Sequence, residues 1–432
     1  MTINWFSPLP PAKTGIATAT WLLLPALAEK AGVTLWTSQP EWDGIAERWA
    51  RVRRFDADEL NHKALNQADI TFFNLGNNSL FHSAIWEASQ RHRGITILHD
   101  VCLQHFYAGY YRQNRQDRGA YVREMRRYYQ EPGRIAAEAF WNGQTKVDDL
   151  AEHFPLTQLA LCNTLGVIVH TRSAFAEIKN LGRCPVAYLP LLRPASEPLR
   201  PQARDDSGPA CKIIMFGHMG LNRRIESTLE ALARFPQKSA LRLDIYGDLE
   251  NESAVRTQIA ALRLERIAHV HGFVAEEELV SALRAADLGI NLRYPTMGEA
   301  SGSQLQLWEY SLPALVTATG FYADLPADTV AFVRPESEIE DIQSHLRDFL
   351  AEPQRFREMG KRGRKYLEKH HSAEGYVEGL LQMATYAREF GRDLVANNLA
   401  RRVGLELGDW FSPDQLEPSC QRAAQAISGM LC

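Results

Sequence analysis

The chain has 432 residues, a length that predicts two or three domains, each with a sizeable core. Hydrophobic residues make up 45% and charged residues 23%, a balance that excludes a disordered or fibrous chain. The formal net charge of −4 gives no support to a nucleic-acid-binding surface, so we expect no nucleic acid among the partners. The sequence contains no run of about 18 apolar residues, so no membrane-spanning helix is predicted. The six cysteines include no C-x-x-C pair, which predicts free thiols and a cytoplasmic location.

Short apolar runs alternate with longer amphipathic segments along most of the chain, a pattern typical of parallel strands joined by helices. The predicted strands are 3–6, 70–75, 95–98, 167–170, 211–216, 241–247, 268–271, 288–292 and 314–317. A segment rich in proline and charge interrupts the pattern once, at 193–209. We therefore predict an α/β protein with two doubly wound Rossmann-like domains that face each other across a cleft.

The predicted domain boundaries follow from this interruption. They are an N-terminal domain at 1–195, a linker at 196–209, a second Rossmann-like domain at 210–375, and C-terminal helices with a tail at 376–432. The last segment is expected to return to the N-terminal domain, and its tail beyond Phe390 either packs there or mediates self-association.

In the first half, two loops follow predicted strands and could reach a ligand, because ligands of such sheets bind beyond the carboxyl ends of the strands. The loop 7–17 contains Gly15 directly before a predicted helix, where a backbone can approach an anion. The pair His99-Asp100 leaves the strand 95–98 and could position a sugar hydroxyl or share a proton. The alternative is that Asp100 caps the next helix and His99 is a packed histidine.

In the second half, the loop 216–224 carries Gly217, His218, Arg223 and Arg224 directly before a predicted helix. Glycines and adjacent arginines at a helix N-terminus are typical of a phosphate site, although neither G-K-[ST] nor G-x-G-x-x-G is present. The alternative is a pair of solvated arginines.

Three further loops extend this predicted site. Gly247 ends one strand, and Phe273 and Val274 follow another. The segment 294–303 combines Glu299 with a turn rich in glycine and serine before a predicted helix at 304–310. This combination offers an acceptor for sugar hydroxyls and backbone donors for a phosphate; the alternative is a capped helix with Glu299 near its start.

Taken in order, these loops resemble a family. The chain is similar to retaining, Leloir-type glycosyltransferases of the GT-B fold, in the group 1 class also numbered glycosyltransferase family four. The resemblance is strongest between 212 and 376 and thinner in the first half. The segments that carry it are 217–224, 246–248, 271–273, 285–288, 298–313, 359–364 and 371–372, with 7–17, 98–100 and 169–173 in the first half.

The resemblance implies a role for each matching residue. Gly15 would approach the diphosphate or the sugar, and His99 would contact the donor sugar with Asp100 beside it. His218 and Arg224, with Arg223 beside them, would hold the departing phosphates. Phe273 and Val274 would meet the base through backbone groups, in line with the position of the Gly247 loop. Glu299 would touch the donor sugar, and the segment formed by Ser301, Gly302 and Ser303 would donate to the sugar and the diphosphate. The four residues assigned to catalysis are His99, Asp100, Glu299 and Arg224.

Two departures from the family pattern are visible. Eight residues after Glu299 stands Leu307 where the family has a second glutamate, and a one-residue deletion would bring Gln306 to that position. This glutamate holds the ribose hydroxyls in the family, and Gln306 could still hydrogen-bond there without a charge. His218 stands where the family has arginine, which weakens the expected stabilisation of the leaving group.

The resemblance implies transfer of a sugar from a nucleoside-diphosphate sugar to a hydroxyl of a glycan or lipid-linked acceptor, with retained configuration and with no cofactor or metal. Alternatives are a nucleotide-sugar epimerase or phosphorylase on this fold, or a non-catalytic protein that binds nucleotide sugars. The single D-x-D, Asp56 to Asp58, is interpreted as a helix cap. The stretch 107–134 is rich in tyrosine and arginine and predicts an amphipathic helix. This helix either packs its tyrosines on the core or makes a peripheral contact with anionic lipid at the inner face of a membrane.

Overall fold

The structure is a computed structural model that describes residues 1–195, 211–410 and 413–431. The predicted linker at 196–209 lies outside the described residues. The described chain forms two compact units: unit 1 comprises 1–192, 297–300 and 373–432, and unit 2 comprises 193–296 and 301–372. The short piece 297–300 therefore belongs to unit 1, although the residues on both sides of it belong to unit 2.

Unit 1 is built on a parallel sheet with the strand order β3-β2-β1-β4-β5-β6-β7. The strands are β1 (Thr2–Phe6), β2 (Gly32–Thr37), β3 (Arg51–Arg54), β4 (Ile70–Leu75), β5 (Gly94–Leu98), β6 (Thr164–Val169) and β7 (Val186–Tyr188). The central strands β4, β5 and β6 are buried along their whole length, which explains why their sequences are continuous apolar runs. Since β1 pairs with β4 as well as with β2, the carboxyl ends of β1, β4, β5 and β6 lie along one edge.

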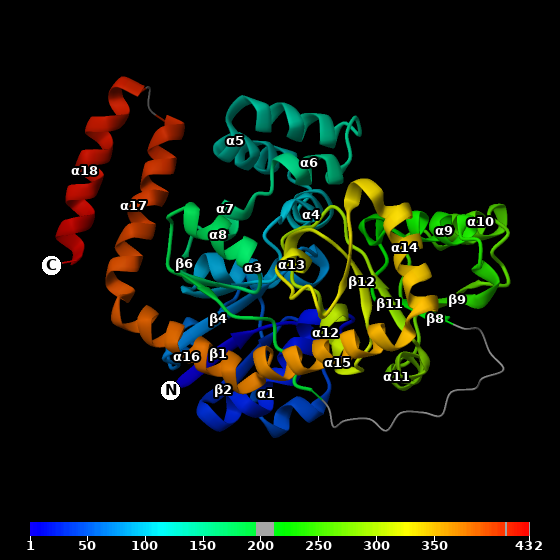
Figure 1. The fold of residues 1–432 in the computed structure, drawn as a ribbon. Helices are drawn as coiled ribbons and strands as arrows, with labels where there is room; N and C mark the ends of the chain where they lie inside the picture. Colours follow the sequence, from blue (N-terminus) through cyan, green and yellow to red (C-terminus); the bar gives the residue numbers. More distant parts are fainter. Residues whose placement is uncertain (196–210, 411–412, 432) are drawn as a thin grey trace. The chain divides into compact units, whose positions relative to one another are not determined.

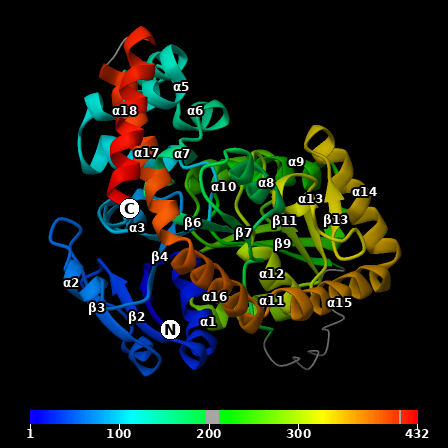
Figure 2. The ribbon, with the colours of Figure 1, turned by 90° about the vertical axis from the view of Figure 1, so that its left-hand side faces the viewer.

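Helices cover both faces of this sheet (Figures 1 and 2). The helices of unit 1 are α1 (Gly15–Lys30), α2 (His62–Leu65), α3 (Ser79–Arg91), α4 (Gln104–Gly109), α5 (Arg118–Trp141), α6 (Val147–His153), α7 (Thr157–Ala160), α8 (Arg172–Asn180), α16 (Ala373–Glu389), α17 (Gly391–Trp410) and α18 (Pro413–Leu431), with short turns η1 (Gly44–Arg48) and η2 (Tyr110–Asn114). On one face, α1 and α16 pack against each other and share a core with the sheet. On the other face, a second core joins the sheet to α3, α4, α5 and α8.

The C-terminal helices pack on unit 1. Helix α17 lies beside β6, where the amide of Asn398 donates to the carbonyl of Thr164 at 2.6 Å. Further along α17, Arg401 donates to the carbonyl of Gly182, and Glu406 pairs with Arg127 of α5. Helices α17 and α18 run side by side as an antiparallel pair (Figures 1 and 2).

Unit 2 is built on a second parallel sheet with the order β10-β9-β8-β11-β12-β13. Its strands are β8 (Cys211–Phe216), β9 (Leu241–Tyr246), β10 (Ala268–Gly272), β11 (Leu288–Asn291), β12 (Ala314–Thr317) and β13 (Ala331–Val333). Its helices are α9 (Ile225–Arg234), α10 (Glu252–Ala261), α11 (Glu276–Ala285), α12 (Gly302–Glu309), α13 (Gly320–Ala323), α14 (Glu338–Ala351) and α15 (Pro353–His370), with turns η3 (Leu221–Arg223), η4 (Lys238–Ala240) and η5 (Pro335–Ser337). Helices α9, α10 and α14 share one core with the sheet, and α11 and α12 lie on its other face (Figures 1 and 2).

The predicted α/β class with two Rossmann-like sheets is confirmed, and every predicted strand is present with its ends within three residues of those observed. The cleft between the domains stays a prediction. Within the described ranges, Cys102, Cys162, Cys184, Cys211 and Cys420 form no disulfide with one another. No helix in the described ranges combines the length and the apolar character needed to cross a bilayer.

The predicted helix over 107–134 is only partly correct. The segment is divided into α4, the π-turn η2 and α5, and α5 itself is kinked where Gln130 has a φ of 55°, two residues before Pro132. Four of its tyrosines, Tyr107, Tyr110, Tyr111 and Tyr121, are buried in the core of unit 1. The structure therefore shows these tyrosines packed on the core, which was one of the two alternatives for this segment.

Candidate functional site

Two glycine turns meet at the carboxyl edge of the unit 2 sheet. Gly217 follows β8 with a φ of 111°, and Gly247 follows β9 with a φ of 121°, so both have backbone conformations that favour glycine. The N–H of Gly217 donates to the carbonyl of Tyr246 at 3.1 Å, and a Cβ at Gly247 would overlap the carbonyl of Gly217. The two turns are thus packed backbone to backbone. A Cβ at Gly217 would lie 3.2 Å from the hydroxyl of Ser303, which places the first turn of α12 beside them.

The N-terminus of α12 is fixed by Ser301. Its hydroxyl accepts from the backbone N–H of Gln304 at 3.1 Å and also contacts the side chains of Asn291 and Tyr322. Ser301 is 1% exposed, so its hydroxyl caps the helix inside the protein. The next residue, Gly302, is exposed, and a Cβ there would meet no atom within 4 Å. The backbone of the first turn is therefore open to a ligand at Gly302 and Ser303, and Gln306 lies half-buried one turn further on.

The two arginines of the loop after β8 differ in their surroundings. Arg223 is buried, and its guanidinium donates to the carbonyl of Phe216 at 3.1 Å, which closes the end of β8. Arg224 has a φ of 57° at the start of α9 and forms a two-pronged ion pair with Glu338, with Nε and Nη2 both 2.8 Å from the carboxylate. Glu338 is buried, and this partner raises the pKa of Arg224 above its ordinary value. The Arg224 side chain is 34% exposed, so Arg224 reaches solvent and Arg223 does not.

Three other predicted contacts lie on exposed turns of unit 2. The His218 side chain is 67% exposed, and its Nε2 lies 3.2 Å from a carboxylate oxygen of Glu250. Phe273 is 61% exposed beyond β10, and Val274 beside it is half-buried. Gly247 N–H donates to the carbonyl of Gly272 at 2.7 Å, which links the loops that follow β9 and β10.

Unit 1 holds the remaining predicted residues. Gly15 begins α1 after the N-cap residue Thr14, is exposed, and has no atom within 4 Å of an added Cβ. Glu299 lies in the piece 297–300, where its carboxylate accepts from the N–H of Met297 at 2.6 Å. The carbonyl of Met297 in turn accepts from the N–H groups of Val101 and Cys102, both at 3.0 Å. The turn that carries Glu299 is thereby attached to the loop that follows His99 and Asp100.

His99 and Asp100 both lie at the carboxyl end of β5. The carboxylate of Asp100 accepts from the N–H of Asn77 at 2.9 Å, and α4 begins after Leu103, so the alternative in which Asp100 caps that helix is wrong. Nε2 of His99 lies 3.0 Å from Oδ1 of Asn74, and its ring is 4.8 Å from that of His170. Burial, together with His170 and His82, holds the pKa of His99 well below its usual range, so the imidazole is neutral at physiological pH.

Sequence reasoning missed several neighbours of these residues. Asn74, near the end of β4, and His170, directly after β6, lie on both sides of His99, and the one polar amide in the run 70–75 is the sequence signal for Asn74. Glu338, the partner of Arg224, lies 114 positions further along the chain, and nothing in the local sequence points to that pairing. The cap interpretation of Asp56 and Asp58 is wrong, because α2 is capped by Asn61.

Instead, Asp56 accepts from the backbone N–H of Asp58, and Asp58 pairs with Arg91 at 2.7 Å. Within the described residues, no group of three or more His, Cys, Asp or Glu side chains is arranged to hold a metal ion.

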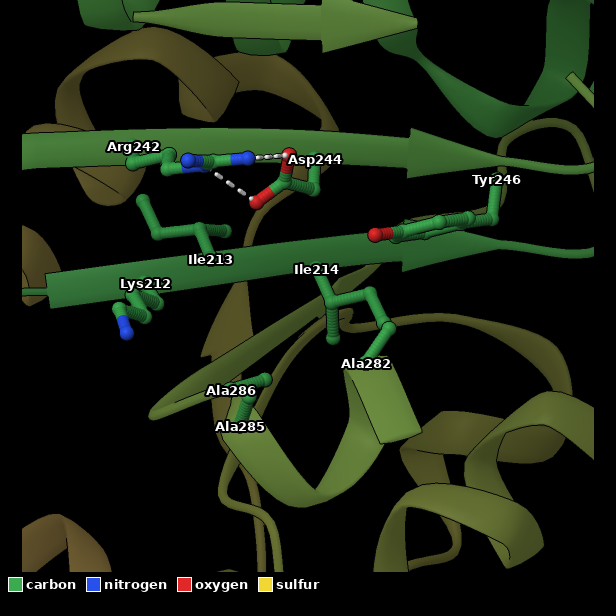
Figure 3. A pocket seen from close by; sticks show the side chains of 9 residues that line it. All are labelled: Lys212, Ile213, Ile214, Arg242, Asp244, Tyr246, Ala282, Ala285 and Ala286. Atoms are coloured by element: carbon green, nitrogen blue, oxygen red, sulfur yellow. Dashed lines mark hydrogen bonds and ion pairs between the residues drawn. The ribbon is translucent and has the colours of Figure 1, made fainter. Parts of the chain in front are cut away.

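A pocket of about 210 Å³ lies on a face of the unit 2 sheet (Figure 3). It is formed between β8, β9 and α11, and Figure 3 shows the ion pair of Arg242 with Asp244 along its wall. Its lining residues are Lys212, Ile213, Ile214, Arg242, Asp244, Tyr246, Ala282, Ala285 and Ala286. The lining extends along the face of the sheet from Lys212 and Arg242, near the amino ends of their strands, to Tyr246, the residue before Gly247.

Comparison with known proteins relates part of the chain to a family. Residues 202–366 match the sequence model of the family described as "Glycosyl transferases group 1". The resemblance to group 1 glycosyltransferases is confirmed. The matched segment contains both glycine turns, Arg224 and the whole of α12. No match was found among curated protein sequences.

Solved structures of glycosyltransferases share the fold of the chain. Sucrose-phosphate synthase from Thermosynechococcus elongatus aligns with a TM-score of 0.62 and 16% identity, over 90% of this chain and 99% of that one. Anabaena HepE in complex with UDP-glucose aligns with a TM-score of 0.59 and 13% identity, over 90% of this chain and 100% of HepE. WaaG, a glycosyltransferase involved in lipopolysaccharide biosynthesis, aligns with a TM-score of 0.56 and 16% identity, over 89% of this chain and 99% of WaaG. At these identities the likeness establishes a two-domain GT-B fold.

Proposed function

We propose that the protein is a retaining glycosyltransferase that moves a hexosyl group from a nucleoside-diphosphate sugar to a hydroxyl of a glycan or lipid-linked acceptor. The observation that carries this proposal is the convergence of Gly217, Gly247 and the open first turn of α12 inside the segment that matches group 1 glycosyltransferases. Close-packed glycine turns and a helix N-terminus provide the backbone donors that a diphosphate needs. The HepE structures of similar fold hold UDP and UDP-glucose, which makes a uridine diphosphate sugar the first donor to test.

The proposed reaction breaks the bond between the anomeric carbon and the diphosphate oxygen and forms a bond from that carbon to the acceptor oxygen. The acceptor hydroxyl loses its proton, and the diphosphate leaves with the bonding electrons. The barrier arises from charge separation between an oxocarbenium-like sugar and the anionic diphosphate. In unit 2, Arg224 and the N–H groups at Gly302 and Ser303 would stabilise the diphosphate, and no metal ion is required in this scheme.

The ion pair of Arg224 with Glu338 bears on this role. A bidentate carboxylate already takes two of the guanidinium donors, so the phosphate would use the remaining N–H groups on the exposed side of Arg224. The pair then serves to orient the guanidinium, since the buried Glu338 holds it in one direction.

The acceptor is proposed to be uncharged at its reacting hydroxyl, and a lipid-linked acceptor would add a membrane contact. The arginines of 107–134 are partly neutralised: Arg115 pairs with Glu87, Arg127 with Glu124 and Arg134 with Glu131 and Glu138. This compensation reduces the basic charge available to anionic lipid. Sedimentation with anionic vesicles at low salt tests the membrane contact, and protein left in the supernatant contradicts it.

The test of the proposed function combines binding and product analysis. The double variant Arg224→Met with Glu338→Gln removes the cation without leaving a buried carboxylate unpaired. We expect its affinity for UDP to fall by at least about tenfold, the effect of losing a charge-assisted hydrogen bond. Arg242→Ala is the matched control, because it breaks an ion pair of the same unit on the sheet face.

The products decide between the proposed function and its alternatives. A new glycoside with the anomeric configuration of the donor supports the proposal. An epimerised nucleotide sugar or phosphate-dependent release supports an epimerase or a phosphorylase, and binding without turnover supports a non-catalytic protein. Unchanged UDP affinity in the double variant would show that the phosphate site is misassigned.

A further inference from the structure

A chain of hydrogen bonds links three neighbouring strands at the carboxyl edge of the unit 1 sheet. Asn74, at 2% exposed, lies near the end of β4 between Phe6 of β1 and His99, the residue after β5. Its Nδ2 donates to the carbonyl of Phe6 at 3.0 Å, and its Oδ1 lies 3.0 Å from Nε2 of His99. A carbonyl oxygen only accepts, so the amide nitrogen must face Phe6. The amide oxygen of Asn74 is therefore fixed toward His99.

This orientation determines where the proton of His99 is. Because Oδ1 of Asn74 only accepts, the hydrogen bond requires a proton on Nε2 of His99. Burial and the nearby His170 and His82 hold the pKa of His99 well below its usual range, so the ring carries one proton only. With that proton on Nε2, Nδ1 has a lone pair and acts as a hydrogen-bond acceptor.

The other two imidazoles around His99 are neutral as well, with the opposite tautomer. His82 Nδ1 lies 3.1 Å from the carbonyl of Asn74, and His170 Nδ1 lies 2.9 Å from the carbonyl of Leu189, so each must carry its proton on Nδ1. Burial lowers the pKa of each to about 4. The nearest carboxylate in sequence, Asp100, accepts from the N–H of Asn77. The hydrogen bonds thus specify the proton position on all three rings.

We propose that Asn74 is a positioning residue that holds His99 as the neutral tautomer protonated on Nε2, so that Nδ1 accepts a hydrogen bond from a sugar hydroxyl. A neutral acceptor nitrogen suits an uncharged hydroxyl and gives no charge attraction to a phosphate or a carboxylate. The ligand class is accordingly a neutral sugar. The identity of that hydroxyl rests on the proposed function, whereas the proton position rests only on the contacts of Asn74.

The proton position is measured directly, without substrate, by two-bond ¹H–¹⁵N spectroscopy on the full chain labelled at histidine. The sequence has 13 histidines, so His99 is assigned from the signal that disappears in His99→Gln. We expect a protonated Nε2 and an unprotonated Nδ1 in the wild type throughout the neutral pH range. A ring protonated on Nδ1, or on both nitrogens at neutral pH, would overturn the proposal.

Two variants test whether Asn74 is the cause. Asn74→Leu removes the acceptor, and we expect the Nε2 preference of His99 to be lost. Asn4→Leu is the matched control, because Asn4 is equally buried and donates to the carbonyl of Leu65 while accepting from Trp36, away from His99. An unchanged His99 signal in Asn74→Leu contradicts the assignment.

Should Asn74→Leu fail to fold, Asn74→Asp gives a second measurement. Once ionised, the new carboxylate favours the doubly protonated ring, so His99 is expected to titrate at a higher pH than in the wild type. An unchanged titration of His99 would contradict the contact.

Activity then tests the link to the sugar. In Asn74→Leu, kcat/KM for sugar transfer is expected to fall about tenfold below that of Asn4→Leu, while the Kd for UDP stays within about twofold, because His99 contacts no phosphate. Equal kcat/KM in the two variants would show that His99 does not hold the sugar. If no nucleotide sugar is a substrate, the proposed function fails, and the spectroscopic result on His99 still decides the proton position.

Discussion

Gly247→Ala tests the packing of the two glycine turns in unit 2. The added Cβ would overlap the carbonyl oxygen of Gly217 and lie 2.8 Å from its carbonyl carbon and 3.1 Å from its nitrogen. All three atoms belong to the backbone, so no side chain can rotate away. The φ of 121° adds strain, because this region is open almost only to glycine.

The expected cost has two parts. Backbone strain contributes about 1–3 kcal/mol, and overpacking against the neighbouring turn contributes about 1–3 kcal/mol. A loss of about 2–6 kcal/mol corresponds to a fall in Tm of roughly 5–20 °C for a unit of this size. Relief of the overlap would also move Gly217 relative to Ser303, so we expect weaker UDP binding.

The assay is thermal unfolding followed by circular dichroism, together with calorimetric titration of UDP. Gly302→Ala is the control, because a Cβ there meets no atom within 4 Å and the residue lies in the first turn of a helix. We expect the control to keep its Tm within about 2 °C, since alanine favours a helix over glycine. If Gly247→Ala has the same Tm as the Gly302→Ala control, the close approach of the two turns is refuted.

Three further predictions concern charge. Gln306→Glu is expected to tighten UDP binding by about fivefold in calorimetric titration, because a carboxylate accepts a ribose hydroxyl more strongly than an amide does; weaker binding would place Gln306 away from the ribose. The pKa of His82 and of His170 is about 4 in the folded state against 6.5 as the ordinary value, so the unfolded chain binds more protons and stability falls as the pH drops from about 6.5 to 4. Each histidine is expected to cost roughly 2 kcal/mol at pH 5 relative to neutral pH; denaturant unfolding at pH 5 and 7.5 measures this loss, and His170→Gln should reduce it. Sugar transfer should keep its rate in excess EDTA, since the phosphate is proposed to be held by Arg224 and backbone groups, and an EDTA-sensitive rate that Mg²⁺ restores would contradict the metal-independent scheme.

The sequence was most informative where one physical signal dominates. Buried parallel strands such as β4 and β5 are continuous apolar runs, so their positions follow from composition alone. The edge strand β3 was missed because its sequence, Arg51–Arg54, contains three arginines and one valine and lies half in solvent. Its pairing with β2 depends on the neighbouring strand, which a local pattern does not reveal.

The site likewise combines features that a local sequence predicts with features that depend on distant segments. Glycine turns and a helix start can be predicted from a short stretch, and the structure places Gly217, Gly247 and Ser303 together. The surroundings of Arg223 and Arg224 could not be predicted, because burial of one and pairing of the other with Glu338 arise from packing between distant segments. The role of Asn74 likewise depends on which backbone carbonyl faces its amide.

The three-part composition of unit 1 constrains how the protein can be divided or recombined. Helix α16 supplies Val377, Leu380 and Ala384 to the core shared with α1, and its Met383 occupies the space above Gly166 of β6. A fragment that stops at residue 195 would expose this apolar surface of α1 and β6 to water and should aggregate. A chimera that exchanges unit 2 must therefore take the segments 193–296 and 301–372 from one parent, and keep the piece 297–300 and both ends of the chain from the other.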